Sequence, residues 1–158
     1  MRRATWDETW ASVADAVSLR SACAVRRVGC VIASADNRVH WVGYNGPPAR
    51  LHPGLDDGDG ASCGLWCPQG GGIGPACVSV HAEINALLQS DFSRRAGCVV
   101  YASQAPCWKC SLAIAASGAA RLVTRPWEPI RASLAADVGD LMTDCGISLT
   151  TDWPRSAT

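Results

Sequence analysis

The sequence predicts an α/β fold in which helices cover both faces of a mixed sheet, and three observations point to it. Helical and β-rich segments alternate through the second half of the chain, which is typical of α/β architecture. Two β-rich runs near the N-terminus have the spacing of an antiparallel hairpin. The chain has 158 residues, enough for one domain with its own core. We therefore expect a single domain over residues 1–158.

The first elements are an expected amphipathic helix and the hairpin. Apolar residues recur near helical period from Trp6 to Val17, which predicts a helix from about 6 to 21 that packs on the core. The two β-rich runs, at 28–33 and 39–43, are separated by the polar sequence Ser-Ala-Asp-Asn-Arg. Two strands should therefore follow the first helix.

A loop rich in Gly, Cys, Pro and Asp is expected at about 46–78. A loop of this length inside a compact domain requires either disorder or something that ties it down. The alternation resumes after it. We expect helices over 80–89 and 107–117, the second ended by Gly118, strands over 97–102 and 121–124, a helix within 130–142 and a strand near 147–151.

Charge and cysteine content narrow the kinds of partner and compartment. The 14 basic and 14 acidic residues cancel, so no overall positive field draws the chain onto nucleic-acid polymers or anionic membranes, and a small substrate is favoured. The N-terminus has no apolar stretch of the signal-peptide kind, and no run approaches the roughly 20 apolar residues of a membrane span. We expect a cytoplasmic protein. The chain has nine cysteines, and in a reducing compartment clustered cysteines indicate metal ligands more readily than disulfides.

Two short motifs, separated by an expected strand, supply a candidate metal site. His81 opens one expected helix, and Cys107 and Cys110 lie in the first turn of the next, after Pro106, which suits a helix start. One imidazole and two thiolates make three ligands for a tetrahedral zinc, and three ligands leave a position for water, as in catalytic sites. The positive end of the helix favours the thiolate forms of the cysteines.

Glu83 lies two residues after His81 and is not needed to complete the ligand set, so it is a candidate proton donor and acceptor. An H-x-E motif followed by P-C-x-x-C is the signature of zinc-dependent nucleobase deaminases, in which activated water attacks the amine-bearing ring carbon. Either motif alone has ordinary explanations, because C-x-x-C is common in redox pairs and structural zinc sites and H-x-E occurs by chance. Their order, at two expected helix starts, favours the catalytic interpretation.

Further runs of sequence carry a resemblance to a known family. They are Ser-Ala-Cys at 21–23, Arg-Arg-Val-Gly-Cys-Val-Ile at 26–32, Gly-Tyr-Asn-Gly-Pro-Pro at 43–48 and His-Ala-Glu-Ile-Asn-Ala-Leu at 81–87. With them the chain resembles the deoxycytidylate (dCMP) deaminase branch of the cytidine deaminase superfamily. The resemblance implies a three-layer α/β/α fold around a five-stranded mixed sheet, hydrolysis of dCMP to dUMP and ammonia for thymidylate supply, and a homo-oligomer, commonly a hexamer.

The same resemblance implies roles in a nucleotide site. Asn45 should contact the nucleotide near its sugar and base, and the backbone amide of Ala82 should hold the pyrimidine carbonyl oxygen. Arg26 and Arg27 are candidates for the 5′-phosphate, because guanidinium groups match phosphate oxygens bidentately; two ordinary solvated arginines are the alternative. Many relatives respond to dCTP and dTTP, and the sequence leaves open a dCTP effector bound with Mg²⁺.

A second, structural zinc is also implied, because several members of the branch place ligands at comparable positions. Four thiolates would close such a site and hold the long loop. His52 in place of one cysteine, or a loop that is simply disordered, are the alternatives. The four are Cys23, Cys63, Cys67 and Cys77, while Cys30, Cys98 and Cys145 are expected to be small buried residues.

Other functions remain as rivals. The tRNA adenosine deaminases share the zinc motifs, but they need a basic surface and lack the Gly-Tyr-Asn-Gly run. A nucleoside or modified-dCMP deaminase is a second rival, and a nucleotide-sensing subunit without turnover is a third, against which Glu83 weighs. Ser103, Gln104, Ala105 and Trp108 differ from the small or acidic residues expected beside the second motif. Trp127 is expected to cover the core rather than stack on a base.

Overall fold

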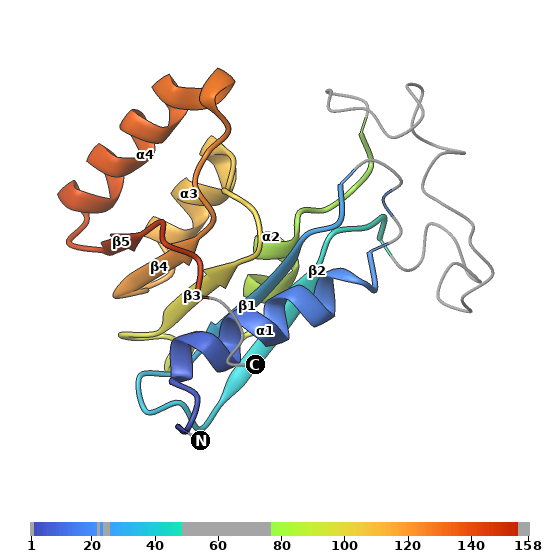
Figure 1. The fold of residues 1–158 in the computed structure, drawn as a ribbon, viewed down its shortest axis with the longest axis vertical. Coiled ribbons are helices and arrows are strands. Elements are labelled where there is room, and N and C mark those ends of the chain that lie inside the picture. Colours follow the sequence, from blue (N-terminus) through green and yellow to red (C-terminus); the bar gives the residue numbers. More distant parts are fainter. Residues whose placement is uncertain (1, 22, 24–25, 49–76, 155–158) are drawn as a thin grey trace.

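The computed structural model describes residues 2–21, 23, 26–48 and 77–154 and shows a five-stranded sheet flanked by helices on both faces (Figure 1). The strand order is β2-β1-β3-β4-β5. The strands are β1 (Gly29–Ala33), β2 (His40–Tyr44), β3 (Val99–Ala102), β4 (Arg121–Thr124) and β5 (Ser148–Thr150). The helices are α1 (Trp6–Ser18), α2 (Ala82–Gln89), α3 (Trp108–Ala115) and α4 (Ala132–Asp144), with 3-10 turns η3 (Phe92–Arg94) and η4 (Pro129–Arg131).

The sheet is mixed, as predicted. β1 pairs antiparallel with β2 and β3, while β3, β4 and β5 run parallel. Parallel neighbours need crossover connections, which α3 supplies between β3 and β4 and α4 supplies between β4 and β5. In the register, Cys30 of β1 pairs with Ala102 of β3, and Ala102 pairs with Thr124 of β4. The start of β1 therefore lies beside the carboxyl ends of β3 and β4.

Both faces of β1 are buried, and its side chains alternate between two halves of the core. Cys30 and Ile32 pack in the cluster that contains side chains of α2, α3 and α4, whereas Val31 and Ala33 pack in the cluster of α1. A strand covered on both faces reads as a continuous apolar run, which is what this segment shows. The arrangement gives the three layers that the resemblance implied.

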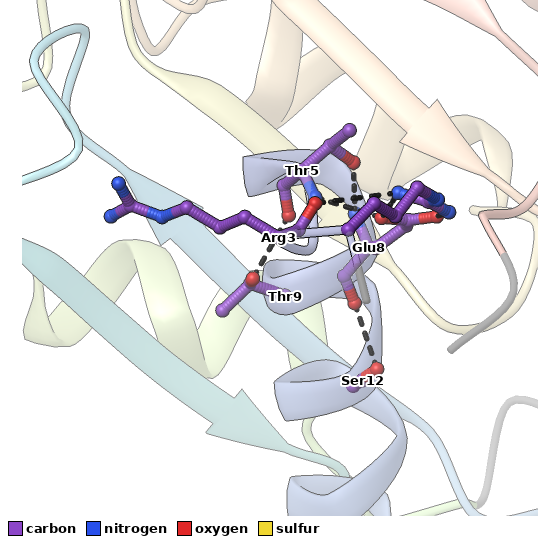
Figure 2. Close-up of polar contacts among 6 residues, drawn as sticks. Arg3, Thr5, Glu8, Thr9 and Ser12 are labelled. Atoms are coloured by element: carbon purple, nitrogen blue, oxygen red, sulfur yellow. Dashed lines mark hydrogen bonds and ion pairs between the residues drawn. The ribbon is translucent and has the colours of Figure 1, made fainter. Parts of the chain in front are cut away.

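α1 begins with a capping box, as its Thr-x-x-Glu sequence favours. The Thr5 hydroxyl accepts a hydrogen bond from the Glu8 N–H at 3.1 Å, and the Glu8 carboxylate accepts one from the Thr5 N–H at 2.7 Å (Figure 2). A hydrogen bond from Arg2 is the main reason why the pKa of Glu8 falls to about 2. α1 ends at Ser18, before the predicted residue 21, and the Ser21 hydroxyl turns away to bond Asn45.

The hairpin holds the first turn of α2. This helix starts at Ala82 rather than at 80, because Val80 pairs with Gly46 through two backbone hydrogen bonds of 2.9 and 3.2 Å. Gly43 of β2 lets the helix approach closely, since a Cβ there would lie 2.3 Å from the Ala82 carbonyl oxygen. The position of residues 81–83 is therefore set by the end of β2.

The structure describes only the two ends of the predicted long loop, and it places one cysteine differently from the prediction. Most of the predicted loop at 46–78 lies outside the described residues, which include only 46–48 and 77–78 of it. Cys30 and Cys98 are buried as predicted, but the prediction for Cys145 was wrong: it is exposed, because it caps the C-terminal end of α4 beyond the packed part of that helix. Within the described ranges, no helix combines the length and the apolar character needed to cross a membrane.

Candidate active site

The N-terminal ends of α2 and α3 meet and bring three candidate ligands together. His81 is the N-cap residue of α2 and Cys107 that of α3, and neither side chain caps its own helix. The His81 Nδ1 atom lies 3.6 Å from the Cys107 Sγ and 3.3 Å from the Cys110 Sγ. Among the residues described, these three form the group that could hold a metal ion, with ligand atoms all within 4.8 Å of one another.

This donor set fits zinc. Zinc binds sulfur at about 2.3 Å and imidazole nitrogen at about 2.0–2.1 Å, so tetrahedral ligand atoms lie about 3.5–3.8 Å apart. The two observed N···S distances, 3.3 and 3.6 Å, are close to this range. A set of one nitrogen and two sulfurs also leaves room for a fourth ligand, which distinguishes catalytic from closed structural sites.

The two thiols are coupled to each other. The pKa of Cys107 is lowered to about 3, mainly by a hydrogen bond from Cys110 and to a smaller extent by one from His81. Donating that hydrogen bond to Cys107 raises the pKa of Cys110 above its ordinary value. The hydrogen bond with Cys107 raises the pKa of His81. The site thus favours a thiolate at the N-terminus of α3, where the helix dipole also stabilises negative charge.

Glu83 lies in the first turn of α2, two residues after the ligand His81. Its side chain is buried, with 4% exposure, and burial raises the pKa of its carboxyl group. The nearby His81 imidazole acts in the opposite direction and lowers the pKa of the Glu83 carboxyl group, but burial is the larger effect. A buried carboxyl group beside the ligand cluster can accept and return a proton without carrying a permanent charge into the core.

Asn45 is buried just beyond β2, and most of its hydrogen-bonding capacity is used inside the protein. Its Oδ1 accepts from the Val28 N–H at 2.8 Å and from the Ser21 hydroxyl at 2.7 Å, and its Nδ2 donates to the Arg26 carbonyl at 2.9 Å. An amide nitrogen has two N–H groups, and within the described part of the chain only one of them has a partner, so the second can donate to a ligand. The sequence placed Ser21 only within the family run at 21–23, and it gave no sign that this hydroxyl orients Asn45.

The other residues predicted to contact the nucleotide are Ala82, Arg26 and Arg27. Ala82 is fully buried at the first helical position of α2, where backbone N–H groups have no partner within the helix. Arg26 forms an ion pair with Glu128 at 3.0 Å, and Arg27 is exposed. The structure thus gives Arg26 a partner that the sequence did not reveal.

The predicted second zinc site is only partly within view. Cys23 and Cys77 are half-buried, whereas Cys63, Cys67 and the alternative ligand His52 lie outside the described residues. The second zinc therefore stays a prediction.

Two residues flanking the second motif have structural contacts. Ser103 is buried, and its hydroxyl accepts a hydrogen bond from the Gly29 N–H at 2.9 Å, which braces β1 against the end of β3. Trp127 packs against the core and donates from its indole nitrogen to the Pro106 carbonyl at 3.1 Å, as expected of a core cover. Both contacts hold the segment that leads into Cys107.

Residues 4–125 match the sequence model of the cytidine and deoxycytidylate deaminase zinc-binding region. The chain is also 39% identical over 134 residues to a deoxycytidylate deaminase of Mycobacterium phage D29, a match that covers 78% of this chain and 96% of the phage protein. The chain belongs to the cytidine and deoxycytidylate deaminase family. It is a hydrolytic deaminase, and the metal named for this region of the family is zinc, in agreement with the ligand cluster.

Other members of the family support the same assignment. A deoxycytidylate deaminase of Saccharomyces cerevisiae is 33% identical over 131 residues, and the match covers 78% of this chain but 38% of the yeast protein. The crystal structure of a dCMP deaminase from cyanophage S-TIM5 superposes with a TM-score of 0.66 at 19% identity, covering 94% of this chain and 98% of the phage chain. A second structure of that protein, at 23% identity, is in complex with dCMP and dUMP. These structures confirm the cytidine deaminase-like fold.

Proposed function

We propose that this protein catalyses the hydrolysis of dCMP to dUMP and ammonia. The observation that best supports this proposal is the cluster of His81, Cys107 and Cys110, together with the buried Glu83 in the same helix turn that follows His81. The 39% identity to a phage deoxycytidylate deaminase supports dCMP as the substrate. In the reaction, the oxygen of one water molecule replaces the 4-amino group of the pyrimidine, and the amino group leaves as ammonia.

His81, Cys107 and Cys110 would hold the zinc ion. When bound, zinc supplies a Lewis acid that lowers the pKa of a coordinated water toward neutrality. The protein contributes two helix N-termini that aim the three ligands at one point, and their distances of 3.3 and 3.6 Å require little rearrangement.

Glu83 is proposed to move the protons. Its carboxylate would take a proton from the attacking water and deliver it to the ring nitrogen beside the reacting carbon. It would then take the second proton, from the hydroxyl group now on that carbon, and pass it to the amino group, so that ammonia leaves and a carbonyl remains. Its burial keeps bulk water from competing for these protons and raises the pKa of the acid form, so the group can alternate between both states.

Asn45 and Ala82 are proposed to orient the nucleotide. The free N–H of the Asn45 amide would donate to the sugar or base, and its other three hydrogen bonds fix the direction of that N–H. The Ala82 N–H would donate to the pyrimidine carbonyl oxygen. Arg26 and Arg27 would bind the 5′-phosphate, because guanidinium groups match phosphate oxygens bidentately.

The test measures ammonia release by zinc-loaded protein from dCMP, CMP and deoxycytidine, with a Glu83→Gln variant beside the wild type. We expect turnover of dCMP above the other two. Glu83→Gln should keep its zinc and lower kcat by about 10²–10⁴-fold, the usual contribution of a general acid-base group. No release from dCMP, or near-normal turnover by the variant, would contradict the proposal.

We further propose a structural zinc held by Cys23, Cys63, Cys67 and Cys77, and assembly into a homo-oligomer. Metal analysis should find about two zinc ions per chain, the sum of one catalytic and one four-thiolate site. A Cys23→Ser variant should lose about one of them and keep the catalytic ion. A value of one zinc per wild-type chain would remove the second site, and light scattering would report the oligomer.

A further inference from the structure

Arg26 and Glu128 form an ion pair between two segments that are far apart in sequence. The Arg26 Nη2 atom lies 3.0 Å from the Glu128 Oε1 atom, and the two side chains are 34% and 58% exposed. Arg26 lies between α1 and β1, whereas Glu128 is the residue that precedes η4 after β4. An exposed pair of this kind shifts an equilibrium constant by at most about fivefold, so it adds little to stability. The position of this ion pair relative to the candidate active site indicates a role in function.

Both partners lie directly beside groups of the candidate active site. The Arg26 carbonyl accepts the hydrogen bond from the Asn45 amide at 2.9 Å. Trp127, next to Glu128, donates to the Pro106 carbonyl at 3.1 Å, and Pro106 precedes the ligand Cys107. The sheet register places all these segments at one edge, where β1 starts and where β3 and β4 end. The ion pair therefore joins the Asn45 side of the site to the Cys107 side.

The chemistry of the pair conflicts with a bound phosphate. Among the described residues, the contact with Glu128 is made by a single nitrogen of the guanidinium group, whereas the group can present two parallel N–H donors to a phosphate. A 5′-phosphate that bound Arg26 would bring about two negative charges next to the Glu128 carboxylate, and like charges at such separations repel. Phosphate and carboxylate are thus alternative partners of one guanidinium group.

We propose that Glu128 is a specificity-determining residue, which holds Arg26 in the free protein and is displaced by the 5′-phosphate of the nucleotide. Glu128 then sets how strongly a nucleotide is preferred over its nucleoside, because only the nucleotide has to break the ion pair and only the nucleotide gains Arg26 in return. This inference rests on the proposed function, and it assigns to Glu128 a role that depends on the phosphate alone.

The experiment compares KM for dCMP and for deoxycytidine in the wild type and in Glu128→Gln. Glutamine keeps the size of the side chain and removes its charge. We expect KM for dCMP to fall about three- to fivefold, the upper part of the range for an exposed ion pair, so the ratio of the deoxycytidine KM to the dCMP KM rises by that factor. Glu128→Lys should move the ratio further in the same direction. An unchanged ratio in both variants would overturn the inference.

A matched control is available on the hairpin. Arg38 and Asp36 form another exposed arginine-carboxylate pair, with 4.0 Å between Arg38 Nε and Asp36 Oδ2, in the turn at the end of β1 remote from Asn45. Asp36→Asn changes the net charge by the same amount as Glu128→Gln and should leave the ratio unchanged. In an Arg26→Ala background, Glu128→Gln should change the KM ratio much less. A full change in that background would mean that Glu128 simply repels the phosphate and does not compete with it for Arg26.

Binding of dUMP, measured by calorimetry, separates this inference from the proposed function. Tighter dUMP binding by Glu128→Gln in a protein that deaminates none of the three substrates would support the inference and contradict the function. Deamination of dCMP by the wild type, with an unchanged KM ratio and unchanged dUMP affinity in the variants, would support the function and overturn the inference.

Discussion

Asn45 shows how a single buried amide can be oriented by its neighbours. The Val28 N–H and the Ser21 hydroxyl saturate its oxygen, and the Arg26 carbonyl takes one of its two N–H groups. Two of these bonds also decide which end of the amide is oxygen, because a flipped amide would place its N–H against the Val28 N–H and its oxygen against the Arg26 carbonyl oxygen. The remaining N–H therefore has one direction, which is the requirement for a group that must recognise a ligand.

Ser21 is expected to act through Asn45. Ser21→Ala removes the hydroxyl group, whose single hydrogen is shared between the Asn45 Oδ1 at 2.7 Å and the Asn45 backbone carbonyl oxygen at 2.8 Å. The unfolding free energy should fall by about 1–2 kcal/mol, because two buried acceptors lose a partner. KM for dCMP should rise several-fold while zinc content stays unchanged, as steady-state kinetics and metal analysis would show.

Ser12→Ala is the control for Ser21→Ala. Ser12 also donates to a backbone carbonyl, that of Glu8, at 2.7 Å, but it lies on α1. Its KM for dCMP should equal that of the wild type. A normal KM in Ser21→Ala as well would mean that Asn45 keeps its orientation without this hydroxyl.

At the scale of elements, the site depends on how closely α2 lies on the hairpin. The first turn of α2 holds both a ligand and the candidate proton carrier, and the end of β2 fixes that turn through Gly43 and through the bridge between Gly46 and Val80. α3 is positioned differently, by the end of β3 and by the contact of Trp127 with Pro106. The metal site lies where these two supports converge.

Gly43→Ala should disturb this support. The added Cβ would lie 2.3 Å from the Ala82 carbonyl oxygen and 2.4 Å from the Ala86 backbone nitrogen, so α2 has to move outward. We expect a loss of about 1–3 kcal/mol in unfolding free energy, as for an overpacked core. We also expect a weaker zinc affinity, because His81 moves away from Cys107 and Cys110; competition with a chelator would measure it.

Gly139→Ala is the matched control for Gly43→Ala. Gly139 lies within α4, and nothing lies within 4 Å of the Cβ that alanine would add. Alanine is favoured over glycine inside a helix by about 0.5–1 kcal/mol, so the variant should gain stability and keep its zinc affinity. Equal zinc affinity in both variants would show that the approach of α2 to β2 does not set the ligand geometry.

At the scale of the whole molecule, the features that could be predicted from the sequence are those that depend on local sequence patterns. The strand at 121–124 was predicted with its observed bounds, because its ends coincide with changes in composition. His81, Glu83, Cys107 and Cys110 were found because their types and spacing are tied to one chemistry, and the structure brings them together. The bend after Ser18 and the delayed start of α2 were missed, because both depend on contacts with the distant hairpin.

Ion pairs between distant segments had no signal in the sequence. Arg26 and Glu128 are 102 positions apart, and Asp15 and Arg125 are 110 apart, so neither pair follows a helical or strand period. Many exposed arginines and carboxylates could pair equally well in an unfolded chain. Only the sheet order, which places β1 beside β3 and β3 beside β4, selects these partners.

Arg125 contacts segments from near the two ends of the described sequence. Its guanidinium group bonds both carboxylate oxygens of Asp15 on α1, at 2.9 and 3.1 Å, and also the Ser103 carbonyl after β3. It lies 4.8 Å from the centre of the Trp153 ring, whose nitrogen donates to the same Asp15 carboxylate. The end of the described chain is thus fastened to the first helix by the Arg125 side chain and by the direct hydrogen bond from Trp153 to Asp15.

Arg125→Gln should therefore lower the unfolding free energy by about 1–2 kcal/mol, a moderate value because the pair is partly exposed. Arg125→Lys should not restore stability, because an ammonium group cannot bond two carboxylate oxygens and a carbonyl in one plane while stacking on an indole ring. Arg38→Gln, which removes an arginine whose ion pair is 4.0 Å long and whose side chain is 85% exposed, should change stability by less than about 0.5 kcal/mol. Denaturant unfolding measures the free energy of unfolding of the three variants. If Arg125→Lys were as stable as the wild type, a positive charge at position 125 would be sufficient and the planar hydrogen-bond network would not be needed.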